Sequence, residues 1–188
     1  PLFRERLEFL HQLGYILKKK YDGKSINVID AGKGNAIKLL EEVTTQFPCY
    51  DDSAEYKGNN VLFHKRAQLF VEECHEALEL EGKVLLYIDE LTALADYKVP
   101  QVLRNRGIIE YSQYLADRVD NYQLILAGSV EEVEIRAFTI ESIDCMVKKL
   151  KPLFPSTNAL EIDYYLWLEG KKTSPGDKPH HRSLTTAH

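Results

Sequence analysis

The sequence predicts a mainly α-helical fold that contains at most one or two short strands. In several long segments the apolar residues recur every three or four positions, which places them on one face of a helix. Ser129 and Glu132 stand at the spacing of a capping box, which marks the start of a helix. After residue 35 one helix-like segment follows another without alternating strands, so a parallel α/β sheet is not expected.

The first part of the chain contains three predicted helices. Residues 3–20 are amphipathic and end in three lysines followed by a glycine turn, which is a typical helix end. Residues 35–47 and 64–80 each carry an apolar stripe. Residues 47–60 are rich in turn formers and are expected to form a loop. Residues 26–30, INVID, form a short run with β character.

The second part of the chain is also predicted to be mostly helical. Residues 84–97 are expected to open extended and to become helical, with Leu91 to Leu94 as one buried turn. Pro100 suits the first turn of a short helix that stops at Gly107. Further helical segments are predicted over residues 111–120, from Ser129 onwards, over 139–150 and over 159–169.

Residues 1–170 are expected to form a single helical domain, followed by an irregular C-terminal tail, 171–188. A chain of 188 residues is long enough for one domain with a substantial core. The tail is polar and includes the string PHHR at 179–182. It either ends the chain as disordered residues or folds back to close a site, and the sequence leaves both open. Because the chain opens inside a helical pattern, we expect it to be the C-terminal part of a longer domain.

The overall charge argues against a nucleic-acid-binding surface. The net charge is −5 and the isoelectric point is about 5.7, with 44% hydrophobic and 28% charged residues, as in ordinary soluble globular proteins. A small anionic ligand held by a few Lys and Arg side chains remains compatible with this balance. The sequence contains no apolar run of the ~18 residues that a membrane span needs and no signal-peptide pattern. We therefore expect no direct nucleic-acid partner and no membrane association, and the oligomeric state is left open.

The three cysteines predict reduced thiols in the cytoplasm. Cys49, Cys74 and Cys145 are widely spaced and form no CxxC motif, whereas a disulfide framework needs an even set. Cys74 is followed by His75, but no second pair stands at zinc spacing. No metal site is therefore expected.

The string VIDAGKGNA, at 28–36, resembles a nucleotide- or methyl-donor-binding loop between a strand and a helix. It does not have the spacing of a P-loop, and it lacks the third glycine of a dinucleotide-binding loop. Such a loop also needs alternating strands and helices after it. A methyl-donor-binding methyltransferase is therefore the least favoured alternative.

Two cations open the predicted helix at 64–80. Lys65 and Arg66 stand in its first turn, where the helix dipole attracts anions. They are either a solvated charged pair or, together with the backbone N–H groups, an anion site that suits a phosphate.

The string LTALADYKVPQ, at 91–101, places the carboxylate of Asp96 after an apolar run. An acid in apolar surroundings costs free energy unless it is paired or used. Asp89 stands seven residues earlier, so a helix between them would put both acids near the same face. Two carboxylates that face one cavity can cleave glycosidic bonds. Spacing alone favours the alternative, in which Asp89 caps a helix and Asp96 forms a salt bridge.

Five strings occur in order along the chain: KRAQ, LTALADYKVPQ, EVEIRA, IDYYLW and PHHR. Together they resemble the queuosine salvage protein family, the queuosine 5′-phosphate N-glycosylase/hydrolases, from about Phe3 to Arg182. The resemblance implies an all-helical fold distantly similar to helical DNA glycosylases. It also implies hydrolysis of the N-glycosidic bond of queuosine 5′-monophosphate, which releases queuine for tRNA modification, without a metal or an organic cofactor.

The resemblance also implies site residues. Asp96 is the first candidate for the carboxylate that faces the sugar, and Asp89 is the second. Tyr97 and Trp167 are candidates for stacking on the deazapurine base. The candidates for binding the 5′-phosphate are Lys65, Arg66, His181 and Arg182. The other predicted substrate contacts are Tyr87, Gln101, Asp163 and His180.

Two positions depart from the pattern of the family. Tyr87 stands where the family pattern has an acid, and Leu168 follows the tryptophan where that pattern has another acid. If the first acid is essential, Asp89 takes its place or the chain binds without cleaving. A non-catalytic module that holds queuine or its nucleotide is therefore the competing hypothesis.

Overall fold

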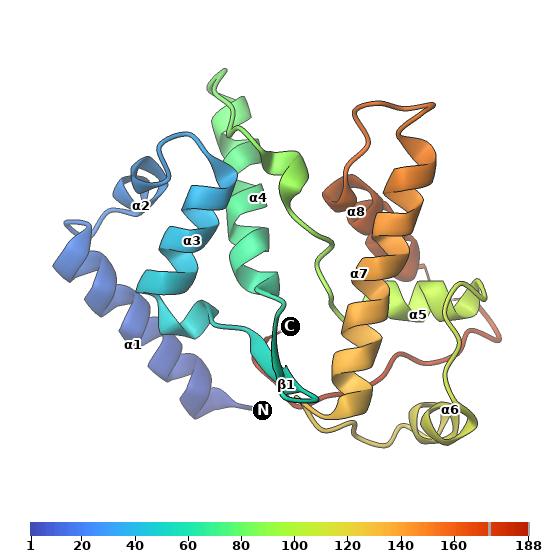
Figure 1. Ribbon diagram of the computed structural model, residues 1–188. Helices are drawn as coiled ribbons and strands as arrows, with labels where there is room; N and C mark the ends of the chain where they lie inside the picture. Colours follow the sequence, from blue (N-terminus) through green and yellow to red (C-terminus); the bar gives the residue numbers. More distant parts are fainter. Residues whose placement is uncertain (173, 188) are drawn as a thin grey trace. The chain divides into compact units, whose positions relative to one another are not determined.

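The computed structural model describes residues 1–172 and 174–187, and over these residues the fold is mainly α-helical, as predicted (Figure 1). The strands of this part of the chain form one two-stranded hairpin. The chain divides into two compact units, a first unit of residues 1–53 and 64–91 and a second unit of residues 54–63 and 92–186. That residues 1–170 act as a single domain stays a prediction.

The first unit is built from four α-helices and two short 3₁₀ turns: α1 (Phe3–Lys20), α2 (Ser25–Ala31), α3 (Ala36–Gln46), η1 (Pro48–Tyr50), α4 (Lys65–Glu79) and η2 (Ile88–Glu90). The predicted helices at 3–20, 35–47 and 64–80 are confirmed. Figure 1 shows α3 and α4 side by side. Leu39 of α3 and Val71 of α4 are fully buried, so the apolar stripes of these helices form the core of this unit.

The strand character predicted for residues 26–30 is wrong, since these residues lie in α2. Val28 is buried, and α2 packs against α3. At the end of α2 a Cβ added to Gly32 would lie only 2.7 Å from the Cβ of Leu39, so this glycine permits close helix packing. The β-branched residues of INVID favour a strand only weakly, and packing against α3 overrides that preference.

A half-buried carboxyl in α4 makes the stability of the fold depend on pH. Burial, with the carboxylates of Glu76 and Glu73, raises the pKa of Glu72 from 4.5 to about 7, and Lys65 opposes this change. Because the folded state holds the proton more tightly, stability is lost as pH rises from 4.5 towards the folded pKa of about 7.

Glu72→Gln is therefore expected to raise the melting temperature at about pH 8, where the charged carboxylate destabilises the fold, and to change it little at about pH 4.5. Thermal unfolding followed by circular dichroism at both pH values measures this. Glu41→Gln, at an exposed position of α3, is the matched control and should show no such pH dependence. An equal change for Glu72→Gln at both pH values would contradict the assigned pKa.

The hairpin of the second unit overlaps the segment 47–60 that the sequence predicts to be a loop, so that prediction is wrong for residues 53–60. Its strands are β1 (Ser53–Tyr56) and β2 (Asn59–Leu62). Lys57 and Gly58 join them with φ of 50° and 79°, as a tight two-residue turn requires. The hydroxyl of Tyr56 donates to Glu134 at 2.5 Å and so connects the hairpin to helix α7 (Val130–Leu150).

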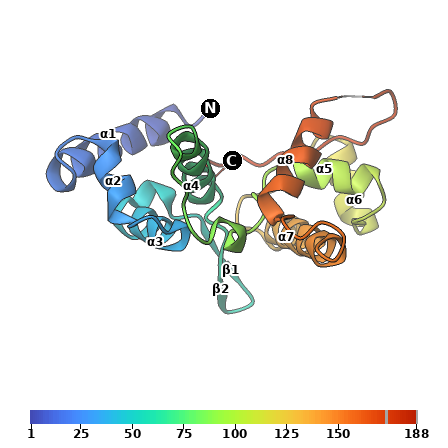
Figure 2. The same cartoon turned by 90° about the horizontal axis from the view of Figure 1, so that it is seen from above.

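The helices of the second unit are α5 (Lys98–Asn105), α6 (Gln113–Asp120), α7 (Val130–Leu150) and α8 (Ala159–Gly170). The helices predicted from Pro100 onwards are confirmed, and the Ser129 hydroxyl accepts from the N–H of Glu132 at the start of α7. Figure 2 shows α5 beside α8. Together with α7 these two helices enclose a core of Ala93, Val99, Val102, Leu103, Ile143, Val147 and Leu166.

Candidate active site

The segment in front of Asp96 has no regular secondary structure, so the predicted helical turn at Leu91–Leu94 is wrong. A 3₁₀ turn ends at Glu90, Leu91 is extended, and no helix begins before Lys98. Leu91 and the residues from Ala93 to Ala95 are nevertheless buried. Their backbone groups must therefore find hydrogen-bond partners in the neighbouring elements.

Asp96 is buried and forms the N-terminal cap of α5. Its side chain is 7% exposed, and its Oδ1 accepts from the N–H groups of Lys98 at 2.7 Å and Val99 at 2.9 Å. The helix dipole places partial positive charge at the same end, which favours the charged carboxylate. The acid that looked misplaced in the sequence is therefore held rigidly by backbone donors.

Two buried side chains hold the backbone immediately before Asp96. Asp163 of α8 is 5% exposed, and its Oδ1 accepts from the N–H of Leu94 at 3.1 Å. Arg136 of α7 is 3% exposed, and its Nε donates to the carbonyl of Ala95 at 3.3 Å. Two peptide groups of this segment, 93–94 and 95–96, are thus bonded to two different helices.

Arg136 is itself held by an acid and an aromatic ring. Its guanidinium carbon lies 3.9 Å from the ring centroid of Phe63, in a cation–π contact. Its Nη1 lies 3.7 Å from Oε1 of Glu132, one helical turn earlier, and both side chains are buried. Glu132 also accepts from the N–H of Gly128 at 3.1 Å. Both members of this ion pair, Glu132 and Arg136, belong to the EVEIRA string.

The C-terminal tail folds back along the second unit. The amide nitrogen of Gln101 donates to the carbonyl of Lys178 at 2.8 Å, and the N–H of Ile125 donates to the carbonyl of Arg182 at 2.8 Å. His181 is 1% exposed. Of the two alternatives that the sequence left open, these contacts favour a tail that folds back. That it closes a site stays a prediction.

Tyr97 and His180 bring the tail next to the start of α5. Their ring centroids lie 4.9 Å apart at an interplanar angle of 43°. Burial, together with the cations Lys98 and Arg182, lowers the pKa of His180 below 6.5. The predicted residues Tyr97 and Arg182 therefore lie near His180, together with Lys98, a cation that the sequence does not single out.

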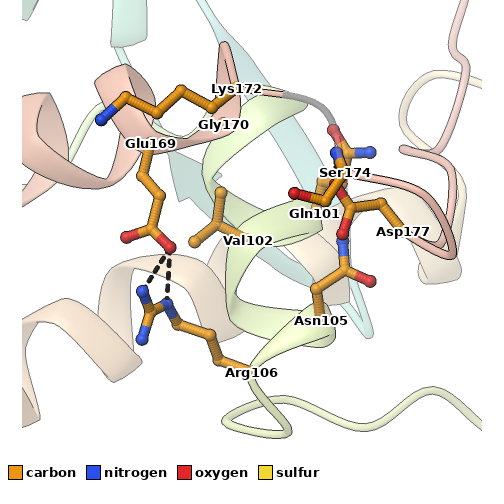
Figure 3. A pocket seen from close by; sticks show the side chains of 9 residues that line it. All are labelled: Gln101, Val102, Asn105, Arg106, Glu169, Gly170, Lys172, Ser174 and Asp177. Atoms are coloured by element: carbon orange, nitrogen blue, oxygen red, sulfur yellow. Dashed lines mark hydrogen bonds and ion pairs between the residues drawn. The ribbon is translucent and has the colours of Figure 1, made fainter.

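A pocket of about 340 Å³ lies between α5, the end of α8 and the tail (Figure 3). In Figure 3 the guanidinium of Arg106 faces Glu169, and its Nε donates to that carboxylate at 3.0 Å. Gln101 and Asn105 stand on its wall, and their amide groups bond to the backbone of Lys178. Gln101, a predicted substrate contact, thus holds the tail on α5.

Trp167 is half-buried, and protein groups lie against its ring. The ring of Tyr164 stacks on it at 5.9 Å, and the Nζ of Lys171 lies 3.4 Å from its centroid. Asp163 stands one turn earlier on α8, as the sequence spacing requires. Stacking of Trp167 on a base stays a prediction, and a base would have to compete with these contacts.

Four predicted site residues belong to the first unit: Lys65, Arg66, Tyr87 and Asp89. Asp89 lies exposed in η2, and because residues 91–96 are not helical, the shared helical face on which its pairing with Asp96 depended is absent. The exposed Tyr87 precedes the same turn in a left-handed conformation, with φ of 64°.

Lys65 and Arg66 open α4, as predicted, and both have protein partners. The N–H of Lys65 donates to Oδ2 of Asp52 at 3.1 Å, so a carboxylate of the protein already lies at this helix N-terminus. The guanidinium of Arg66 donates to the carbonyl of Cys49 at 3.4 Å and lies over the Tyr50 ring. A phosphate site at this position stays a prediction.

Comparison with known proteins decides the family. The model of the family described as queuosine salvage protein matches residues 1–186. The chain belongs to the queuosine salvage protein family. The resemblance carried by the five sequence strings is thereby confirmed.

The relatives within the queuosine salvage family are longer than this chain. A protein of Sphaerobacter thermophilus named queuosine 5′-phosphate N-glycosylase/hydrolase is 40% identical over 98% of this chain and 58% of its own length. Proteins with the same name in Dictyostelium discoideum and Mus musculus are 37% and 33% identical, over 98% and 89% of this chain. They are covered over 58% and 52% of their own lengths, so the chain spans little more than half of each.

Neither a metal cluster nor a cofactor-binding sheet is found in the part of this family member that the structure describes. Residues 1–172 and 174–187 contain no group of three His, Cys, Asp or Glu side chains able to hold a metal ion. The string VIDAGKGNA runs from α2 through a turn into α3, where Asn35 caps the helix, so the predicted strand before the turn is missing. None of the described helices is long and apolar enough to span a bilayer.

Proposed function

We propose that this protein takes part in hydrolysis of the N-glycosidic bond of queuosine 5′-monophosphate, releasing queuine. Membership of the queuosine salvage family and the shared name of the relatives support this proposal. The observation that carries it is the buried carboxylate of Asp96, which backbone N–H groups hold at the start of α5. The free thiols Cys49, Cys74 and Cys145 fit the cytoplasmic compartment in which we place the reaction.

The proposed reaction breaks the bond between C1′ of the ribose and the base nitrogen. The electron pair of that bond leaves with the base, which takes up a proton, and positive charge develops on the sugar. Asp96 stabilises this charge, and because its carboxylate is poorly hydrated and already positioned, little reorganisation is needed. A water oxygen then bonds to C1′ and loses a proton, which gives queuine and ribose 5-phosphate.

The remaining substrate contacts are assigned by the charge and shape of the nucleotide. Tyr97 stands next to Asp96 with its side chain partly exposed, and we propose that it contacts the base. His180 lies near the cations Lys98 and Arg182, and we propose that this group of side chains binds the 5′-phosphate of the substrate. Lys65 and Asp89 belong to the first unit, and their roles as phosphate contact and second acid stay predictions.

The test is to incubate the full-length protein with queuosine 5′-monophosphate and to quantify free queuine and ribose 5-phosphate by mass spectrometry. We expect equal amounts of both products. Calorimetry on the same sample distinguishes an enzyme from a non-catalytic binding module, because tight binding of the nucleotide without products would identify the binding module. The methyltransferase alternative needs a parallel sheet, whereas the only sheet among the described residues is the hairpin.

A further inference from the structure

We infer that Asp163 and Arg136 are positioning residues that set the direction of the Asp96 carboxylate through the backbone of residues 94 and 95. The inference rests on the proposed function, in which Asp96 acts on the sugar. It assigns Asp163 a role other than the substrate contact that the sequence suggested. The two residues come from different helices, α8 and α7, and reach the same short segment.

The hydrogen bonds converge on two nearby peptide groups of the chain, 93–94 and 95–96. Asp163 holds the N–H of Leu94, and Arg136 holds the carbonyl of Ala95. The next group along the chain is the side chain of Asp96, fixed by the first N–H groups of α5. Hydrogen bonds therefore hold both the backbone just before Asp96 and the carboxylate of Asp96 itself.

Such anchors are needed because the segment belongs to no helix or strand. In a helix, neighbouring residues would fix the backbone dihedrals through their own hydrogen bonds. In residues 91–96 the side chains of α7 and α8 supply part of this restraint instead. A change of ψ at Ala95 would swing the carboxylate, and a displacement of about 1 Å at a reacting group can cost about 10²-fold in rate.

The burial of the two charged side chains fits a positioning role. Asp163 is 5% exposed, and one oxygen of its carboxylate accepts from a backbone N–H. Arg136 is 3% exposed and packs on the ring of Phe63. Buried charges cost free energy, and apolar residues of similar size often stabilise a fold as well or better. Their presence around one short segment is explained if the geometry of that segment matters for activity.

The first test uses variants of Asp163 that keep or remove the acceptor. Asp163→Asn retains an oxygen that can accept from the N–H of Leu94, whereas Asp163→Ala removes it. With queuosine 5′-monophosphate we expect Asp163→Ala to lower kcat about 10- to 100-fold with KM almost unchanged, and Asp163→Asn to stay within about threefold of wild type. Glu161→Gln, exposed on the same helix, is the matched control and should behave as wild type.

The second test repeats Asp163→Ala in an Asp96→Asn background. If Asp163 acts through Asp96, adding Asp163→Ala to the Asp96→Asn variant should change kcat by less than about threefold, because the carboxylate that Asp163 positions is already absent. Equal losses in both backgrounds, or an Asp163→Asn variant as impaired as Asp163→Ala, would overturn the inference. Should Asp163→Ala fail to fold, Arg136→Lys serves instead, since it keeps the charge and loses the Nε donor to Ala95.

A readout without substrate separates this inference from the proposed function. Native-state hydrogen exchange should show the Leu94 amide exchanging faster in Asp163→Ala than in wild type, with Asp163→Asn close to wild type. If wild type releases no queuine, the proposed function is wrong. If the exchange rate of the Leu94 amide is the same in Asp163→Ala as in wild type, Asp163 does not hold this part of the backbone and the positioning role is wrong.

Discussion

Asp96→Asn is expected to lower the turnover of queuosine 5′-monophosphate by about 10²- to 10³-fold while the protein stays folded. The asparagine oxygen can still accept from the N–H groups of Lys98 and Val99, so the cap of α5 survives. What is lost is the negative charge that stabilises the developing sugar cation. Steady-state kinetics measure the loss, and circular dichroism with thermal unfolding verifies the fold.

Two further variants show how much of the change comes from the Asp96 cap and whether Asp89 contributes to turnover. Asp96→Ala removes the cap as well as the charge, and should cost about 1 kcal/mol of stability in addition to the turnover. Asp89→Asn, on the exposed 3₁₀ turn, shows whether a second acid takes part. If Asp96→Asn keeps a rate near that of wild type, Asp96 is only a helix cap.

Arg136→Met should produce the largest loss of stability, about 3–5 kcal/mol in the free energy of unfolding. The substitution leaves the carboxylate of Glu132 buried without the guanidinium that lies 3.7 Å away. It also removes the donor to the carbonyl of Ala95. Chemical denaturation with urea, followed by circular dichroism, measures the change in the unfolding midpoint.

The double variant Arg136→Met with Glu132→Gln tests the reason for that loss. Glutamine is neutral and keeps an oxygen for the N–H of Gly128. If an uncompensated buried charge causes most of the loss, the double variant recovers a large part of it. A double variant as unstable as Arg136→Met alone would instead assign the loss to packing on Phe63 and to the bond with Ala95.

The helices could be predicted from the sequence because their signals are local. The apolar spacing in residues 3–20 and the Ser129 cap depend only on nearby residues, and both match α1 and the start of α7. INVID was read as a strand because its β-branched residues carry a weak local preference, while the packing of α2 on α3 is a tertiary contact. The hairpin was missed because its turn is Lys57–Gly58 and not Asn-Gly or Asp-Gly.

The chemistry of the site was harder to predict, because its contacts join distant parts of the chain. The sequence marks Asp96 as an acid after an apolar run, but its cap on α5 depends on residues 91–96 being non-helical, which the apolar run did not indicate. Leu94 and Asp163 are 69 positions apart, and Ala95 and Arg136 are 41 apart, so no spacing rule connects them. The family resemblance marks Asp163 as a substrate contact, whereas the structure shows that its carboxylate accepts from the N–H of Leu94.

The measurement that tests the central claim most directly is release of queuine with the protein in excess over queuosine 5′-monophosphate. Under these single-turnover conditions, product release does not limit the observed rate. We expect wild type to convert the bound nucleotide completely to queuine and ribose 5-phosphate, and Asp96→Asn to bind it with similar affinity but to convert it about 10²- to 10³-fold more slowly. Bound nucleotide that stays intact with wild type, or equal rates for the two proteins, would contradict the account.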